Sequence, residues 1–130
     1  MKRKNKIKRV MVDMTGSIIH HGHIRLLKKA SKLGRVIVAL TSDREVKKYK
    51  KFKPPLNFNQ RKEILVAITY VEKVIKSNFI ITDRFLKQNK IDILVHGSDN
   101  KNKINSKFLK IFKRTKKINS TKLRKKISII

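Results

Sequence analysis

The sequence predicts an α/β fold in which a mostly parallel sheet is covered by helices on both faces. Short runs of apolar, often β-branched residues alternate along the chain with segments whose apolar residues recur at helical spacing. The runs show little polar alternation, as expected for strands that are buried on both faces. Strands that alternate with helices pair in parallel through right-handed crossovers. At 130 residues, the chain is long enough for one such domain and too short for two.

The first strand, helix and strand of this pattern span about 35 residues, the length of a βαβ unit. A strand is expected from Ile7 to Met14, and the small or polar residues after it end the strand. The helix that follows Gly22 has one apolar face, formed by Ile24, Leu27, Ala30 and Leu33. Gly34 stands where a C-terminal helix cap is expected, and residues 36–40 form the second strand.

The remaining predicted elements are shorter. The polar, lysine-rich stretch from Asp43 to Lys53 predicts a short helix and then a loop. Asn57 or Asn59 can cap the next helix, whose buried face is expected to contain Ile64, Leu65, Ile68 and Val71. The later elements are a strand at 74–75, a helix capped by Thr82 or Asp83 and reaching about Asn89, strands at 93–95 and 109–112, and a helix at 120–127.

Basic residues dominate the composition: 36 Lys and Arg face eight Asp and Glu, which gives a net charge of +28. Such a charge attracts polyanions, but the lysines are scattered along the whole chain and are not interleaved with stacking aromatic residues. The abundance of Lys, Asn and Ile is also expected from an A/T-rich coding sequence. We therefore expect no nucleic-acid partner, and a positive field that attracts nucleotides and phosphorylated substrates.

The sequence also restricts the cellular setting. The absence of cysteine excludes disulfides, thiolate metal sites and a cysteine nucleophile. No apolar run approaches the ~20 residues needed to span a bilayer, and the basic N-terminus is not followed by the apolar segment of a secretory signal. We expect a cytoplasmic protein without a membrane contact, with a basic tail at residues 1–8 and one domain at residues 9–130.

Three of the four histidines lie within four residues, at His20, His21 and His23 around Gly22. This cluster falls between the first strand and the first helix, where open α/β sheets bind ligands and where a helix N-terminus favours an anion. Gly22 lets a phosphate approach the backbone, and two imidazoles and a nearby hydroxyl can donate hydrogen bonds to it. Metal binding is the alternative, but too few further ligands are available for a zinc site, so we expect no direct protein ligand to a metal.

Five stretches of the sequence resemble the cytidylyltransferase family. Residues 15–23 read T-G-S-I-I-H-H-G-H, where the family has an H-x-G-H motif, and residues 114–121 read R-T-K-K-I-N-S-T, where it has R-T-x-G-I-S-T-T. Residues 96–99 resemble a G-x-D element that follows a core strand, and residues 59–62 and 70–74 resemble the E-R-K and R-Y-V-D-E-V stretches. The stretches occur in the order that the family has, and the resemblance extends over nearly the whole chain, from about residue 9 to 127.

The resemblance implies a single Rossmann-like domain with a five-stranded sheet in the order 3-2-1-4-5, assembled as a homodimer. It implies a nucleotidyltransferase that moves CMP from CTP to a small phosphorylated acceptor, such as glycerol 3-phosphate or a similar alcohol or sugar phosphate, and releases pyrophosphate. Mg²⁺ would accompany the triphosphate. An adenylyltransferase that uses ATP on a phosphorylated acceptor is the alternative with the same fold.

The resemblance also assigns roles to individual residues. His20 and His23 contact the nucleotide phosphates and stabilise charge on the reacting α-phosphate, while Arg114 helps to hold the β- and γ-phosphates. Arg61, together with Lys48 and Lys50, binds the phosphate of the acceptor. The remaining predicted nucleotide-binding residues are Thr15, Gly16, Ser17, Gly22, Gly97, Asp99, Thr115, Ser120 and Thr121.

Several positions depart from the family pattern. Gly16 and Ser17 stand where the family has Phe and Asp, so a carboxylate near the phosphates is missing. Lys117 replaces a Gly and Asn119 replaces a Ser of the second signature, and Asn100 stands where close relatives have Trp. The missing carboxylate keeps open a relative that binds a nucleotide without catalysis, and the charge of +28 keeps open a basic nucleic-acid-binding module.

Overall fold

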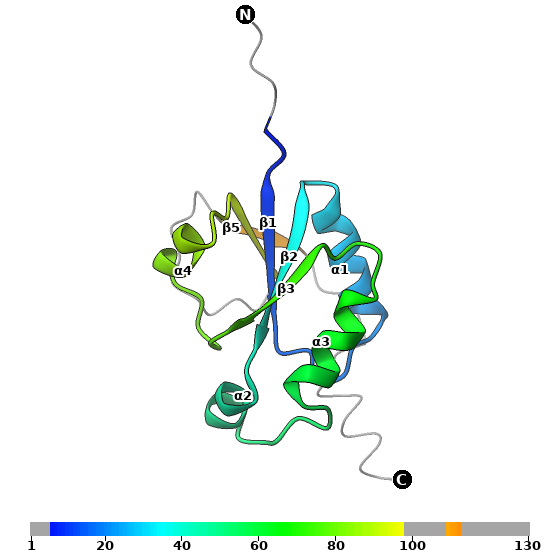
Figure 1. Ribbon diagram of the computed structural model, residues 1–130, viewed down its shortest axis with the longest axis vertical. Helices are drawn as coiled ribbons and strands as arrows, with labels where there is room; N and C mark the ends of the chain where they lie inside the picture. Colours follow the sequence, from blue (N-terminus) through cyan, green and yellow to red (C-terminus); the bar gives the residue numbers. More distant parts are fainter. Residues whose placement is uncertain (1–5, 98–108, 113–130) are drawn as a thin grey trace, which may run out of the picture.

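Five parallel strands form one sheet in the order β3-β2-β1-β4-β5 (Figure 1). The computed structural model describes residues 6–97 and 109–112 of the chain. Each strand pairs in parallel with its neighbours, and the central strand β1 sets Val10 opposite Val36 of β2 and Ile93 of β4. The elements, in chain order, are β1 (Arg9–Met14), α1 (His21–Ser31), β2 (Arg35–Thr41), α2 (Asp43–Lys50), α3 (Phe58–Val66), β3 (Lys73–Ser77), α4 (Asp83–Gln88), β4 (Ile93–Gly97) and β5 (Leu109–Phe112).

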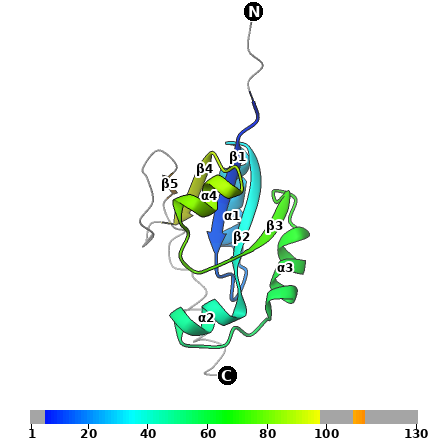
Figure 2. The ribbon, with the colours of Figure 1, turned by 60° about the vertical axis from the view of Figure 1, so that its left-hand side comes forward.

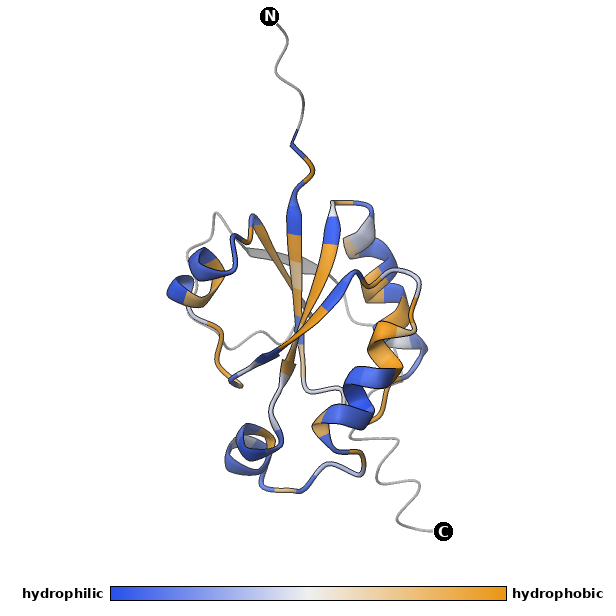
Figure 3. Ribbon diagram, in the orientation of Figure 1, coloured by the Kyte–Doolittle hydropathy of each residue, from blue (hydrophilic) through white to orange (hydrophobic). Residues whose placement is uncertain are grey.

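Two apolar clusters cover the two faces of the sheet. Side chains alternate along a strand, so Val10 and Val12 of β1 pack with Leu27 of α1 and Leu65 of α3, while Met11 packs on the opposite face with Leu86 of α4 and its neighbours. Figure 2 shows α4 and α3 on opposite sides of the sheet, and Figure 3 shows the apolar residues concentrated in the strands. The predicted α/β fold with helices on both faces is confirmed, as is the order β3-β2-β1-β4; the helix predicted at 120–127 lies outside the described residues.

The buried face of α3 differs from the prediction. The helix ends at Val66, and of its predicted apolar face Leu65 is fully buried but Ile64 is 39% exposed. Arg61 takes the other buried position, because residues four apart share a face of a helix. Ile68 and Val71 follow the helix and are partly buried against the same cluster.

The structure shows which of the alternative cap residues begins α3 and which begins α4. Asn57 caps α3 in a reciprocal arrangement with Gln60, and Thr82 caps α4. Within the described part of the chain, no helix is long and apolar enough to cross a bilayer.

Gly34 has a different role from the predicted helix cap. The cap residue of α1 is Lys32, in right-handed helical conformation, and Gly34 lies in the turn before β2. A Cβ at this position would overlap the backbone carbonyl of Lys8, which accepts a hydrogen bond from the Arg35 N–H (2.8 Å). Glycine is therefore required for a close backbone approach that aligns β1 with β2.

We expect Gly34→Ala to lower the free energy of unfolding by about 1–3 kcal/mol, since the added methyl group forces a backbone shift in a packed region. Chemical denaturation followed by circular dichroism measures the change. Lys32→Ala, at an exposed position in the same turn, is the matched control. A Gly34→Ala protein as stable as this control would contradict the role assigned to the glycine.

Candidate functional site

The candidate site lies beyond the carboxyl end of β1, in the loop that leads to α1. Gly16 in this loop has a φ of +60°, and a Cβ there would lie 3.0 Å from the Ile19 Cδ1. The left-handed backbone conformation and the tight contact both favour glycine. Ser17, which stands where the family has Asp, is 3% exposed. The loop is therefore a tight, largely buried turn.

Two imidazoles cap the first turn of α1. The Gly22 N–H donates to the His20 Nδ1 (3.0 Å), and the His20 N–H donates to the His23 Nδ1 (3.1 Å). The two rings lie close together, with their centroids 4.0 Å apart. Since each Nδ1 accepts a hydrogen bond, the proton of each neutral ring is on Nε2, where it can be donated to a ligand. The first turn of α1 contains no acidic residue, so the helix N-terminus favours an anion.

His21 is placed differently from the other two histidines. It is the first residue of α1, it is exposed, and its ring centroid lies 6.1 Å from that of His20. Within residues 6–97 and 109–112, no three His, Cys, Asp or Glu side chains are grouped so that they could hold a metal ion.

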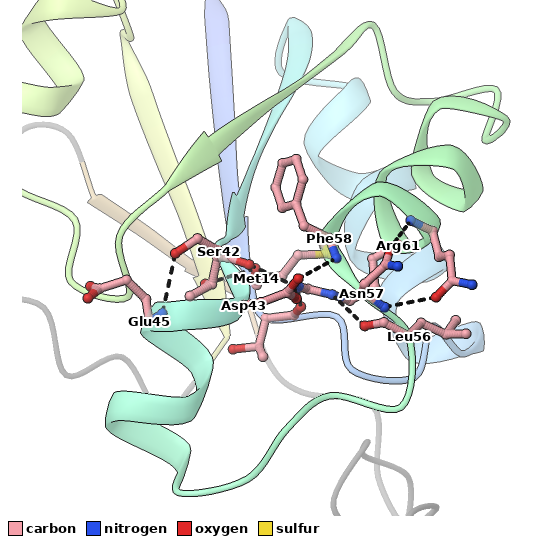
Figure 4. A network of polar contacts seen from close by, with 11 residues as sticks. Met14, Ser42, Asp43, Glu45, Leu56, Asn57, Phe58 and Arg61 are labelled. Atoms are coloured by element: carbon pink, nitrogen blue, oxygen red, sulfur yellow. Dashed lines mark hydrogen bonds and ion pairs between the residues drawn. The ribbon is translucent and has the colours of Figure 1, made fainter.

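Arg61 of α3 connects three chain segments at the same edge of the sheet (Figure 4). Its Nη1 donates to the carbonyl oxygens of Thr15 (2.6 Å) and Thr41 (2.9 Å). Its Nε donates to the carbonyl of Leu56 (3.2 Å), and its Nη2 donates to the Asp43 Oδ1 (2.6 Å). The side chain is fully buried, so an acceptor phosphate could reach this predicted ligand only if the packing around it opened.

Asp43, the first residue of α2, is the acidic partner in this network. Its Oδ2 accepts a hydrogen bond from the Phe58 N–H (3.0 Å) at the start of α3. Burial alone would raise the pKa of Asp43, but the hydrogen bonds from Phe58 and Arg61 and the charges of Arg61 and Lys76 hold this pKa below its usual value of 3.8. The carboxylate therefore stabilises the fold in its ionised form.

The predicted acceptor lysines, Lys48 and Lys50, are both exposed on α2. Residues two apart on a helix do not share a face, so the two ammonium groups do not converge from these positions. The Lys48 Nζ lies 5.2 Å from the Tyr49 ring centroid, and the Lys50 Nζ lies 5.8 Å from that of Phe79. These two rings are stacked, with centroids 4.8 Å apart, and join α2 to the segment after β3.

Two residues of this region were not predicted from the sequence. Asp43 could have been identified as an acidic residue that directly follows a strand, in a chain that has only eight acidic residues. Lys76, near the carboxyl end of β3, has its Nζ 4.8 Å from the Phe58 ring centroid. Nothing in the sequence distinguishes Lys76 from the many other lysines. Both lie at the edge of the sheet where β1 and β2 end.

The other half of the predicted site is only partly described. Gly97 is the last residue of β4, which pairs with β1 in parallel, so its backbone lies at the same edge of the sheet as Thr15. The remaining predicted nucleotide-binding residues lie outside the described residues: Asp99, Arg114, Thr115, Ser120 and Thr121. Their roles stay predictions.

The lowered pKa of Asp43 predicts how stability depends on pH. Because the folded-state pKa is below the unfolded value, the carboxylate stabilises the fold at every pH above about 4, and this contribution is lost as the pH falls through the folded value. We expect Asp43→Asn to be less stable than the parent protein at neutral pH, by a margin that shrinks below about pH 4. Urea denaturation across this range measures the margin. Glu63→Gln, at an exposed position of α3, controls for the loss of one charge, and a margin independent of pH would contradict the assignment.

Comparisons with known proteins identify the family to which the chain belongs. The sequence profile of the cytidylyltransferase-like family matches residues 17–126. The chain is 33% identical, over 129 residues, to the glycerol-3-phosphate cytidylyltransferase of Bacillus subtilis, covering 94% of this chain and 98% of that protein. It is 37% identical over 94 residues to the FAD synthase of Pyrococcus horikoshii, covering 70% of this chain and 63% of that protein.

Other relatives are longer, and the chain spans 32% and 23% of the length of two of them. Among solved structures, a lipopolysaccharide core biosynthesis protein from Thermoplasma volcanium superposes with a TM-score of 0.66 at 23% identity, covering 95% of this chain and 88% of that chain. That likeness supports the fold. The extent of the profile match and the nearly full-length likeness to the Bacillus protein lead to one conclusion: the chain belongs to the cytidylyltransferase-like family.

Proposed function

We propose that the protein is a nucleotidyltransferase that transfers CMP from CTP to a small phosphorylated acceptor, such as glycerol 3-phosphate, and releases pyrophosphate. The observation that carries this proposal is the pair of imidazoles at the start of α1, whose Nδ1 atoms both accept backbone hydrogen bonds. Their Nε2–H groups and the helix N-terminus suit a polyphosphate. The likeness to the Bacillus glycerol-3-phosphate cytidylyltransferase along nearly its whole length supports the choice of nucleotide and acceptor.

In the proposed reaction, an acceptor phosphate oxygen attacks the α-phosphorus of CTP in line. A new P–O bond forms as the bond between the α-phosphorus and the bridging oxygen breaks, and the bond's electron pair leaves with pyrophosphate. A phosphate monoester is already a nucleophile near neutral pH, so the protein needs no strong general base. Its contribution is to position the reactants and to neutralise developing charge, which His20 and His23 do by donating from Nε2 to oxygens of the α-phosphate.

A second group of residues completes the proposed site. Arg114, with Thr115, Ser120 and Thr121, holds the β- and γ-phosphates, and Asp99 lies beside the base or ribose, with Gly97 leaving room. Lys48 or Lys50 attracts the phosphate of the acceptor. The proposed assembly is a homodimer, as expected for a family member of this length.

Mg²⁺ is expected to bind mainly through the triphosphate. The β1–α1 loop contains hydroxyl groups at Thr15 and Ser17 rather than a carboxylate, and triphosphate oxygens are ligands that Mg²⁺ prefers. When bound, the ion would neutralise charge on the phosphates and on the leaving pyrophosphate.

A second candidate is an adenylyltransferase. The 37% identity to the FAD synthase of Pyrococcus horikoshii favours it, because a synthase of an adenine dinucleotide uses an adenine nucleotide. The same phosphate-binding loop would serve both reactions, so the base and the acceptor distinguish the candidates.

A substrate panel tests the proposal. Pyrophosphate release is measured with each of the four nucleoside triphosphates against glycerol 3-phosphate, phosphocholine, phosphoethanolamine, sugar phosphates and flavin mononucleotide. We expect turnover with CTP and glycerol 3-phosphate or a similar alcohol or sugar phosphate. Turnover with ATP alone would select the second candidate. Thermal stabilisation by CTP without pyrophosphate release, or salt-steep binding to nucleic acid without it, would refute the enzymatic proposal.

His23→Glu separates catalysis from helix capping. Glu at the third helical position can still accept the hydrogen bond from the His20 N–H, but its carboxylate has no N–H to donate to a phosphate. We expect kcat to fall by about 10²–10³ or more, as on loss of an oxyanion donor, while the thermal unfolding midpoint stays close to that of the parent protein. His21→Glu, which adds the same charge at the exposed first residue of α1, is the matched control, and near-normal turnover in a folded His23→Glu protein would disprove the assigned role.

A further inference from the structure

We infer that Arg61 and Asp43 form a positioning pair, which sets the loop before His20 and His23 against α2, and that Arg61 does not bind the acceptor phosphate. This inference rests on the proposed function for its catalytic consequence, and on the described contacts for its geometry. It replaces the role that family resemblance suggests for Arg61 with one derived from this chain's own packing.

Most N–H groups of the Arg61 guanidinium already make hydrogen bonds within the protein. A guanidinium has five N–H donors and no acceptor, and four hydrogen bonds to three carbonyls and one carboxylate are present here. The side chain of Arg61 is 0% exposed. A phosphate could reach the fifth N–H only if the packing around this fully buried side chain opened, and it could reach the other four only by displacing Asp43 or a backbone carbonyl, each of which would then lose its donor.

One of these bonds holds the loop between β1 and α1 in place. The Thr15 carbonyl belongs to the peptide that joins Thr15 to Gly16, whose φ is +60°. Holding this carbonyl fixes the orientation of that peptide, and the chain reaches the capping residue His20 only a few residues later. The direction in which the loop leads to the two imidazoles therefore depends on Arg61.

Asp43 extends the contacts of Arg61 to α2. One of its oxygens accepts from Arg61 and the other accepts from the Phe58 N–H, so one carboxylate joins the first residues of α2 and α3. The proposed acceptor lysines lie on α2. The pair consequently connects the helix on the acceptor side to the loop on the nucleotide side.

A positioning role and a phosphate-binding role predict different kinetics. Loss of a phosphate ligand raises the KM for the acceptor, whereas loss of a positioning residue misaligns the imidazoles and lowers kcat. Lysine also distinguishes the roles, because its ammonium group can bind a phosphate but cannot reproduce a planar fork that contacts two carbonyls and a carboxylate. Arg61→Lys should therefore keep a contact with a phosphate, if Arg61 makes one, but should lose the positioning of the loop.

The experiment compares the parent 130-residue protein with Arg61→Lys, Asp43→Asn and Lys62→Ala, the last at an exposed position next to Arg61. Two measurements are made: kcat and KM for the nucleotide and acceptor that the substrate panel selects, and amide hydrogen exchange of residues 15–22 in the ligand-free protein. Asp43→Asn keeps the test valid if Arg61→Lys fails to fold, because the Asp43 side chain is 45% exposed.

We expect Arg61→Lys and Asp43→Asn to lower kcat by about 10²-fold, the effect of a misplacement of about 1 Å, with little change in the KM for the acceptor. Exchange in residues 15–22 should be faster in both variants and unchanged in Lys62→Ala. A large rise in the KM for the acceptor, with kcat and loop exchange unchanged, would overturn the inference. If no acceptor supports turnover, the proposed function fails, but the exchange comparison still decides the positioning role: unchanged exchange refutes it.

Discussion

Backbone carbonyls at the carboxyl edge of the sheet need hydrogen-bond donors, and side chains supply them. All strands end at this edge because every neighbouring pair is parallel, and buried carbonyls beyond the strand ladder are costly without a partner. The Thr41 hydroxyl donates to the Met14 carbonyl (3.2 Å), and Arg61 donates to the carbonyls of Thr15 and Thr41. The polar groups around the candidate site thus also complete the fold.

The histidines at the start of α1 also complete the fold next to the candidate site. His20 and His23 complete the first turn of α1 through Nδ1, and this places the proton of a neutral ring on Nε2, the atom that is proposed to contact the nucleotide. One pair of side chains therefore determines both where α1 begins and which ring atom carries the proton. For this reason, loss of activity in an alanine variant would not by itself identify a catalytic role, since the helix start changes as well.

The sequence predicts the elements well where the pattern is local. The unit formed by β1, α1 and β2 was predicted from apolar runs and helical spacing, and the structure confirms it. The buried face of α3 was predicted in part, at Leu65. The burial of Arg61 was missed because an arginine does not count as apolar, and the partner of its guanidinium at Thr15 is 46 residues away in the chain. Gly34 was predicted to cap a helix, but its contact with Lys8 depends on the pairing of β1 with β2, which no local pattern contains. The histidine cluster was predicted as a unit and does lie at the start of α1; the roles of its residues remain proposals.

The way α2 is attached has a consequence for dynamics. The helix buries one side chain, Val46, and its other contacts are polar groups at its first turn and the stacked rings of Tyr49 and Phe79. If the ion pair of Asp43 with Arg61 stays intact, opening the rest of α2 would expose little apolar surface, so this local opening costs far less free energy than global unfolding. Ligands could then enter and leave on the α2 side of the protein when this one short helix opens, while the five strands stay paired.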